Sequence, residues 1–247
     1  PALASGVAAA TGAGWAVAGA VGALFAAVPF AARLPTRKYG ARSSRLTFAA
    51  VGDDLGAGAR AIANIPGLRA ITAASCIAYF GYGMFVVACP ILGLDRLGAA
   101  DRGVLLLSVA AAAALLATGA MARHSPRCAA EITFVAATSV AALAFLFAAL
   151  SSGPVALVIA IALFGAGEGP QLAAVFAIRQ REAPARLRGQ IFTTAASLKL
   201  SVGALGAVTG GVVLVHGADI ALIVAAFTQV AAVVTVGRSA GSTRAAH

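Results

Sequence analysis

Charged residues are scarce in this chain: of its 247 residues only 11% are Asp, Glu, Lys or Arg, and three are histidine. This excludes an ordinary soluble domain, in which about a quarter of the residues carry a charge. The three cysteines, Cys76, Cys89 and Cys128, give neither a disulfide framework nor a metal-ligand spacing. Because no Ser/His/Asp arrangement is present either, we expect no enzyme, no cofactor and no metal centre.

Apolar residues are abundant instead: 61% of the chain is hydrophobic and the mean hydropathy is +0.95. Seven apolar runs are long enough to cross a hydrocarbon layer of ~30 Å as helices, and a shorter run covers residues 1–10. The seven runs are 15–32, 70–94, 103–122, 132–150, 155–178, 191–215 and 220–236. The sequence therefore predicts an all-α, polytopic membrane protein with seven full transmembrane helices and a partial first one, embedded in a lipid bilayer.

The basic residues are distributed unevenly between the two sides that such a topology defines. Fifteen Lys and Arg residues lie in one set of alternate segments, and only Arg96 and Arg102 lie between the helices on the other side. The positive-inside rule places the richer side in the cytoplasm. That side contains the segments 33–69, 122–131 and 179–190 and the C-terminal tail. We thus expect a multi-pass plasma-membrane protein with a cytoplasmic C-terminus, and no nucleic-acid partner, because the charges are dispersed over short loops.

One segment is too long and too polar to be a simple turn between helices. Residues 34–68 are interrupted by several Gly, Pro and Ser residues, which predicts a cytoplasmic linker between two helical bundles. Asp53 and Asp54 predict the start of a short surface helix that ends near Ile62. The domains expected are the end of one bundle at 1–33, the linker at 34–68 and a second bundle at 69–247.

Two charged residues lie inside apolar runs. Glu168 lies eleven residues before Arg179, at the start of a basic loop, and Lys199 lies eleven residues after Arg188, at its end. At ~1.5 Å per helical residue both charges are expected near the membrane midplane. An ionisable residue at this depth is a candidate functional site, so Glu168 is either a proton-titrating or cation-binding carboxylate or one half of a static ion pair with Lys199.

The residues around Glu168 favour a functional role. Gly167, Gly169 and Pro170 are adjacent to it, together with Gly165, and this composition predicts a kinked or opened helix. Broken helices often line substrate sites in transporters.

Small residues follow Lys199 along one helix face. Gly203, Gly206 and Gly210 come at steps of four, three and four residues from Lys199, and such a face permits close approach of another helix. We therefore expect the lysine to point toward protein or a water-filled cavity.

Four more residues are candidates for the same cavity. Gln171 is one turn from Glu168, and Gln229 is an isolated amide in the last apolar run; interhelical hydrogen bonding is the alternative for both. Tyr79 and Tyr82 are candidates for an aromatic wall around an organic substrate, with ordinary helix packing as the alternative.

Several segments resemble the major facilitator superfamily of transporters. Residues 1–6 and 11–15 are similar to the end of the fifth helix of its exporters and the turn into the sixth. Residues 183–189, Ala-Pro-Ala-Arg-Leu-Arg-Gly, resemble its loop between the tenth and eleventh helices, and residues 119–127 stand at a loop motif of its second half. In the latter, Arg127 matches the motif and Arg123 replaces its Asp. The resemblance assigns four arginines to cytoplasmic loops: Arg123, Arg127, Arg186 and Arg188.

This resemblance implies a fragment that runs from the middle of helix five to helix twelve, and the absence of an initiating Met and of a signal peptide agrees with that expectation. Residues 69–247 would be the C-terminal six-helix half of a two-bundle transporter. The family implies alternating access around a midplane site, driven by an ion gradient. We expect a monomeric secondary transporter of a small organic solute, in first place a proton-coupled exporter. The alternatives are a metabolite uptake permease of the same superfamily and a truncated, non-transporting membrane protein.

Overall fold

The computed structural model describes residues 48–124 and 128–244, together with Gly22 and Phe25. The expected helix at 15–32 and the first bundle segment at 1–33 lie outside this part of the chain, apart from those two residues.

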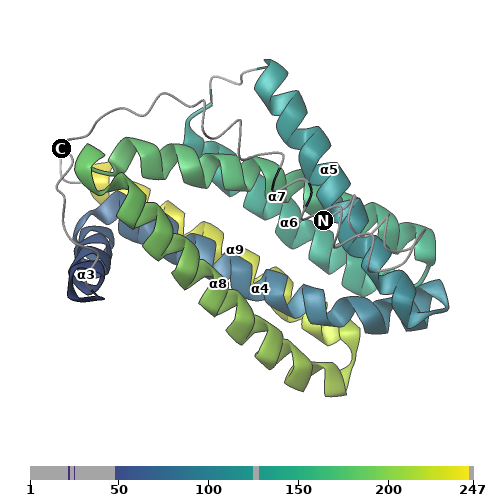
Figure 1. Ribbon diagram of the computed structural model, residues 1–247. Helices are drawn as coiled ribbons and strands as arrows, with labels where there is room; N and C mark the ends of the chain where they lie inside the picture. The colour runs from purple at the N-terminus through teal and green to yellow at the C-terminus, as the bar shows by residue number, and fades with distance from the viewer. Residues whose placement is uncertain (1–21, 23–24, 26–47, 125–127, 245–247) are drawn as a thin grey trace.

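The described residues form a bundle of long helices and contain no β-strand (Figure 1). A shorter helix, α3 (Phe48–Asn64), comes first. The six helices long and apolar enough to cross a membrane are α4 (Pro66–Leu97), α5 (Gly103–His124), α6 (Ala130–Leu150), α7 (Pro154–Glu182), α8 (Arg188–Val213) and α9 (Ala218–Arg244). Short 3₁₀ turns η1 (Ala100–Arg102), η2 (Ala185–Leu187) and η3 (Leu214–His216) lie between them. The expectation of an all-α, multi-pass membrane protein is confirmed at this level.

Several helices begin a few residues before the apolar runs that predicted them. Pro66 and Pro154 occupy the first turn of α4 and α7, where a missing N–H costs nothing and the fixed φ favours the helix. At the other end of α4, Gly98 adopts φ 82°, a left-handed conformation suited to glycine, and its N–H bonds back to the Gly93 carbonyl. Local backbone chemistry therefore sets these ends, and the helices continue past the apolar residues.

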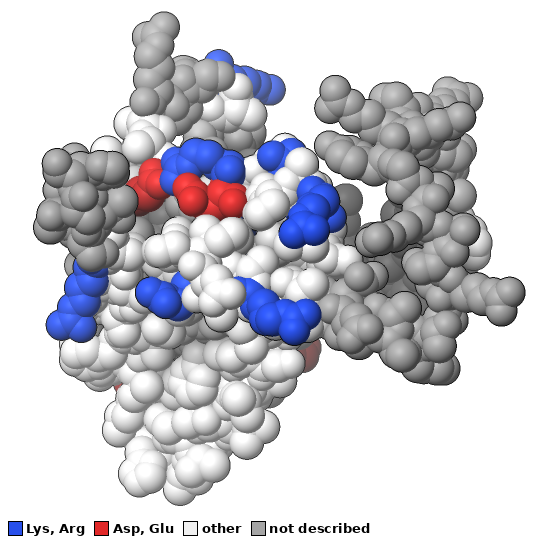
Figure 2. All heavy atoms as spheres, turned by 90° about the vertical axis from the view of Figure 1, so that its left-hand side faces the viewer, with Lys and Arg blue, Asp and Glu red and all other residues white. Residues whose placement is uncertain are grey.

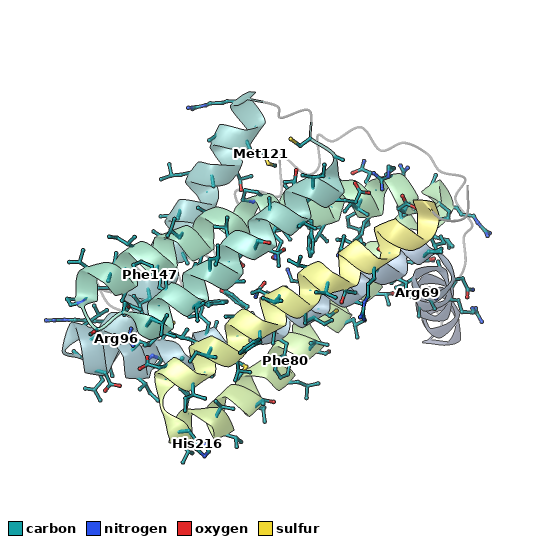
Figure 3. The ribbon with its side chains drawn as sticks, turned by 180° about the vertical axis from the view of Figure 1, so that it is seen from behind. Arg69, Phe80, Arg96, Met121, Phe147 and His216 are labelled. Carbon is teal, nitrogen blue, oxygen red and sulfur yellow. The ribbon has the colours of Figure 1, made fainter. Side chains whose placement is uncertain are left out.

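The α4 helix is the centre of the bundle and packs against α7, α8 and α9. The α6 helix packs against α7 and α9, and α5 lies mainly against α7. Seen from the front in Figure 1, α8, α4, α7 and α5 follow one another, and Figure 3 shows α9 and α6 covering the rear. We call this front surface, formed by α8, α4, α7 and α5, the four-helix face.

The outside of the bundle is apolar, as lipid contact requires. Leu116 on α5 is 73% exposed, Val208 on α8 69% and Phe227 on α9 69%. In Figure 3, Phe147 of α6 also points outward. Fully buried side chains fill the interior: Phe85, Phe134, Phe145, Leu106, Leu157, Ile161 and Leu222.

The two ends of the bundle differ in charge. Successive helices run in opposite directions, and Figure 3 shows Arg69 and Arg96 at opposite ends of α4. Figure 2 looks at the end that carries α3, where Lys and Arg side chains gather, with a few Asp and Glu side chains among them. We name the two ends the α3 end and the Arg96 end. This sorting agrees with the uneven distribution in the sequence, and the cytoplasmic location of the α3 end remains an expectation from that distribution.

The α3 helix corrects one detail of the expected linker. Asp53 and Asp54 lie inside α3 and do not begin it. Ile62 near its end is buried in a cluster with Leu68 and Ile191, so this part of the linker packs onto the ends of α4 and α8.

Candidate functional site

Glu168 is the middle residue of α7, with fourteen helical residues on either side. Its side chain is half-buried. It lies within electrostatic reach of Lys199 on α8 and of Tyr79 and Tyr82 on α4. Two consecutive helices, α7 and α8, and the distant helix α4 thus place one acid, one base and two phenols together on the four-helix face.

Lys199 does not form a direct ion pair with Glu168. Among the described residues no carboxylate oxygen comes within 4.0 Å of its ammonium, which lies 4.3 Å from the centre of the Tyr79 ring. A cation over an aromatic face is attracted by the ring's negative π-surface. The static ion pair left open by the sequence is therefore absent as a contact, although the two charges still influence one another.

Tyr79 and Tyr82 stack on one another, with ring centres 5.0 Å apart. Tyr82 in turn stacks on Phe164 at 6.0 Å, and Phe164 on Phe145 at 4.4 Å. An aromatic row therefore leads from Lys199 into the apolar core. Both tyrosines are only half-buried, so their rings are available to a solute from the four-helix face as well as to helix packing.

The glycines around Glu168 have a packing role. A side chain at Gly165 or Gly169 would collide with α5, at Ala110 and Ala114, and one at Gly167 with the Ala137 carbonyl of α6. These glycines let α7 approach both neighbours closely.

Of the kinked or opened helix predicted for α7, the opened form is not observed: the helix is continuous through Pro170. Pro170 still removes one backbone hydrogen bond, the one that the Ala166 carbonyl would accept. Contacts with α5 and α6 hold the helix together in spite of that loss.

The glycines of α8 face α4. A side chain at Gly203 would meet the Tyr79 ring, one at Gly206 the Phe80 carbonyl, and one at Gly210 the Met84 backbone. Lys199 shares this face, which explains why its ammonium lies on Tyr79.

The two glutamines do not join the charged cluster. Gln171 donates a hydrogen bond of 2.7 Å to the Thr138 hydroxyl of α6, and Gln229 donates one of 2.9 Å to the Ala78 carbonyl of α4. Interhelical hydrogen bonding, the alternative stated for both, describes their contacts.

Arg179 is the functional candidate that sequence reasoning missed. It was expected to begin a loop, yet α7 continues to Glu182 and the Arg179 side chain is only 3% exposed. It donates a hydrogen bond of 3.0 Å to the Ser75 hydroxyl of α4, while its Nε has no partner among the described residues. The signal that could have found it is the spacing of eleven residues from Glu168, which is close to three helical turns and places both on one face.

The other loop arginines that the structure describes lie at or next to helix ends. Arg123 is exposed near the end of α5, Arg186 is exposed in η2, and Arg188 begins α8 and donates to the Ala183 carbonyl at 3.3 Å. Arg127 lies outside the described residues.

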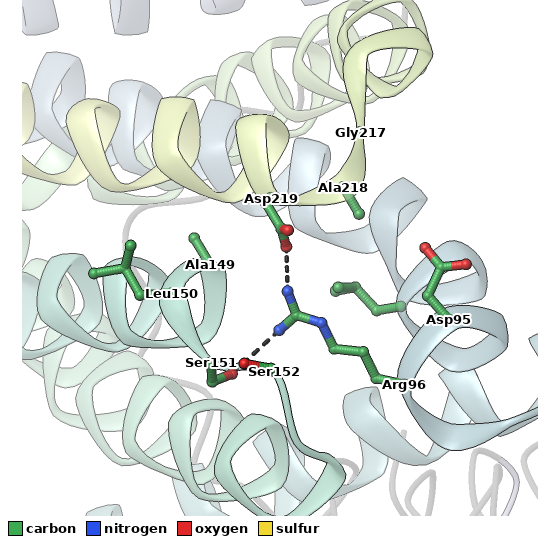
Figure 4. Close-up of a pocket in the computed structure, with 10 residues that line it drawn as sticks. Asp95, Arg96, Ala149, Leu150, Ser151, Ser152, Gly217, Ala218 and Asp219 are labelled. Carbon is green, nitrogen blue, oxygen red and sulfur yellow. Dashed lines mark hydrogen bonds and ion pairs between the residues drawn. The ribbon is translucent and has the colours of Figure 1, made fainter.

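Arg96 organises the opposite end of the bundle, beside a cavity of about 450 Å³ (Figure 4). Its guanidinium pairs with Asp219 of α9 and donates to the Ser151 hydroxyl at 3.1 Å and to the Ala148 carbonyl at 2.5 Å. Ala148 is in the last turn of α6, where carbonyls lack helical partners and a cation is favourable. This network joins α4, α6 and α9 and is a structural clamp.

No protein-family model, no curated protein and no solved structure matches the chain. Within the part of the chain that the structure describes, no group of His, Cys, Asp or Glu residues could hold a metal ion.

Proposed function

We propose that this protein is a secondary active transporter that moves a small organic solute across the membrane, coupled to protons, by alternating access. The observation that carries the proposal is the cluster of Glu168, Lys199, Tyr79 and Tyr82 on the four-helix face. A charged residue in the middle of a membrane helix costs about 2.5–3.5 kcal/mol, so its presence calls for a use. A direct ion pair would be such a use, and Glu168 makes none among the described residues.

The arrangement of the cluster supports proton coupling. Because Glu168 is half-buried and no cation of the described residues lies within 4.0 Å of it, its carboxylate can take up and release a proton without breaking a salt bridge. Lys199 and the tyrosines come from α8 and α4, so a solute between them and Glu168 would sense the charge of the carboxylate.

Two directions of transport are open. The resemblance to exporters of the major facilitator superfamily favours efflux by exchange with protons. The charge of the site favours the second candidate, an uptake permease, because Lys199 and Arg179 outnumber Glu168 and an anion could enter together with a proton.

The test uses the complete gene product, purified and reconstituted into liposomes that contain a pH-sensitive dye. We expect one or more members of a panel of drugs, sugars, amino acids and aromatic acids to cause proton movement when added to one side. Movement of protons opposite to the solute indicates exchange, and movement with the solute indicates uptake. A non-transporting membrane protein would give no solute-dependent proton movement with any member, and that result would reject the proposal.

A further inference from the structure

Two cations lie close together on the inner surface of the site and lack anionic partners. Lys199 and Arg179 are within electrostatic reach of one another, and Glu168 is the carboxylate in reach of Lys199. No carboxylate among the described residues comes within 4.0 Å of either cation. The guanidinium of Arg179 is almost fully buried, and among the described residues the Ser75 hydroxyl is its one side-chain hydrogen-bond partner.

Buried cations are normally paired, because removing a charge from water is costly unless an anion compensates it. Here the second positive charge has no counterpart in the described part of the chain, and a negative group supplied by the solute would provide one. Arg in particular binds carboxylates and phosphates through several parallel N–H donors. The Nε of Arg179, which has no partner in the described part of the chain, is such a donor.

We propose that the substrate is an organic anion with an aromatic ring, whose negative group binds Lys199 and Arg179 while its ring packs against the edges of Tyr79 and Tyr82. The inference rests on the proposed transport function and names its substrate class. Lys199 and Tyr82 lie against the Tyr79 ring, and Tyr82 also stacks on Phe164, so the two half-buried rings offer a solute their edges beside the Lys199 ammonium. Arg179 donates to Ser75 and Lys199 lies over Tyr79, one helical turn further along α4, so both cations and the rings face the same stretch of that helix.

The proposal makes anion binding depend on Glu168. Lys199 of α8 and Tyr79 and Tyr82 of α4 are the titratable groups that face Glu168. The α5 and α6 helices also pack against α7, and apart from Glu131 at the start of α6 they carry no acid between residues 103 and 150. An ionised Glu168 competes with the solute for Lys199, and a protonated one does not. Anion and proton should therefore bind together, which favours uptake over exchange.

The experiment measures equilibrium binding of three probes of equal shape to the purified, complete gene product: naphthoate, naphthamide and (naphthylmethyl)ammonium. We expect naphthoate to bind about tenfold tighter than the other two, since one ion pair in a partly buried site is worth on the order of 1–2 kcal/mol. Its affinity should rise as the pH falls from 8 to 6, and in Glu168→Gln that pH dependence should disappear.

Matched variants assign the effect to the two cations. Lys199→Gln should weaken naphthoate binding about tenfold and leave naphthamide unchanged, and Lys199→Arg, which keeps the positive charge, should still bind naphthoate more tightly than naphthamide. Arg179→Gln should also weaken naphthoate binding. Arg186→Gln, which removes an exposed cation of η2, is the control and should change nothing.

The outcomes separate this inference from the transport proposal. If the cationic or neutral probe binds as tightly as naphthoate, or if no probe binds, the anion site is wrong, whatever the liposome experiment gives. If Lys199→Gln leaves naphthoate binding unchanged, the assignment is wrong as well. If phosphatidylglycerol displaces naphthoate while liposomes show no solute-driven proton movement, the site binds a lipid headgroup and both proposals fail. Tight binding of naphthoate without transport, not displaced by the lipid, retains the anion site and rejects the transporter.

Discussion

The close packing of α8 on α4 can be tested with a single methyl group. A side chain at Gly206 would collide with the backbone carbonyl of Phe80, which cannot rotate away as a side chain could, so Gly206→Ala must push the two helices apart. Overpacking of this kind costs about 1–3 kcal/mol. Alanine also favours the helix over glycine by about 1 kcal/mol, which offsets part of that cost.

Gly211 in the same helix provides the control. Nothing lies within 4 Å of a side chain built there, so Gly211→Ala should carry the helix-propensity gain without the collision. The difference in stability between the two variants should therefore equal the packing cost alone, about 1–3 kcal/mol. Reversible unfolding in micelles with a rising fraction of denaturing detergent, followed by circular dichroism, measures this difference. Equal stabilities would refute the packing of α8 on α4 at this position.

Two further predictions concern the ends of the bundle. Cys128 is an exposed natural cysteine and lies toward the α3 end, which we expect to be cytoplasmic. An impermeant thiol reagent added outside intact cells should therefore not label Cys128, but it should label Ser152→Cys at the Arg96 end. The opposite labelling pattern would mean that the topology is inverted. Arg96→Met should lower stability by about 1–3 kcal/mol because the Ala148 carbonyl and the Ser151 hydroxyl lose the charged donor that they share, and the Ala148 carbonyl keeps only the Ser151 hydroxyl as a side-chain donor among the described residues. Asp219→Asn should cost less than about 1 kcal/mol, because an exposed ion pair contributes little. Equal losses in thermal unfolding of the two variants would contradict the capping role of Arg96.

Hydropathy was sufficient to predict the six spanning helices of the described chain, because each must bury about twenty apolar residues in lipid. The spacing of Lys199, Gly203, Gly206 and Gly210 also predicted a single face, and that face meets α4 in the structure. Both features are local and periodic, so a single continuous segment of sequence is enough to predict each of them.

The contacts of the charged residues could not be predicted in the same way. Hydropathy predicts that Arg179 begins a loop. In the structure α7 continues to Glu182, and this extension buries Arg179 against Ser75. The sequence places Glu168 at a depth similar to that of Lys199, yet the Lys199 ammonium lies on the Tyr79 ring. This contact follows from the packing of α4 against both α7 and α8. Continuity of α7 through Pro170 depends likewise on neighbours that the local sequence does not specify.

Proton coupling through Glu168 is tested most directly by comparing two transport modes of Glu168→Gln in liposomes. The substitution keeps the shape of the side chain and removes its ionisation. We expect it to abolish transport driven by an imposed proton gradient while exchange of labelled for unlabelled solute partly survives, and Asp101→Asn, an exposed acid of η1, should retain both modes. Gradient-driven transport by Glu168→Gln at the rate of the unmodified protein would contradict the account.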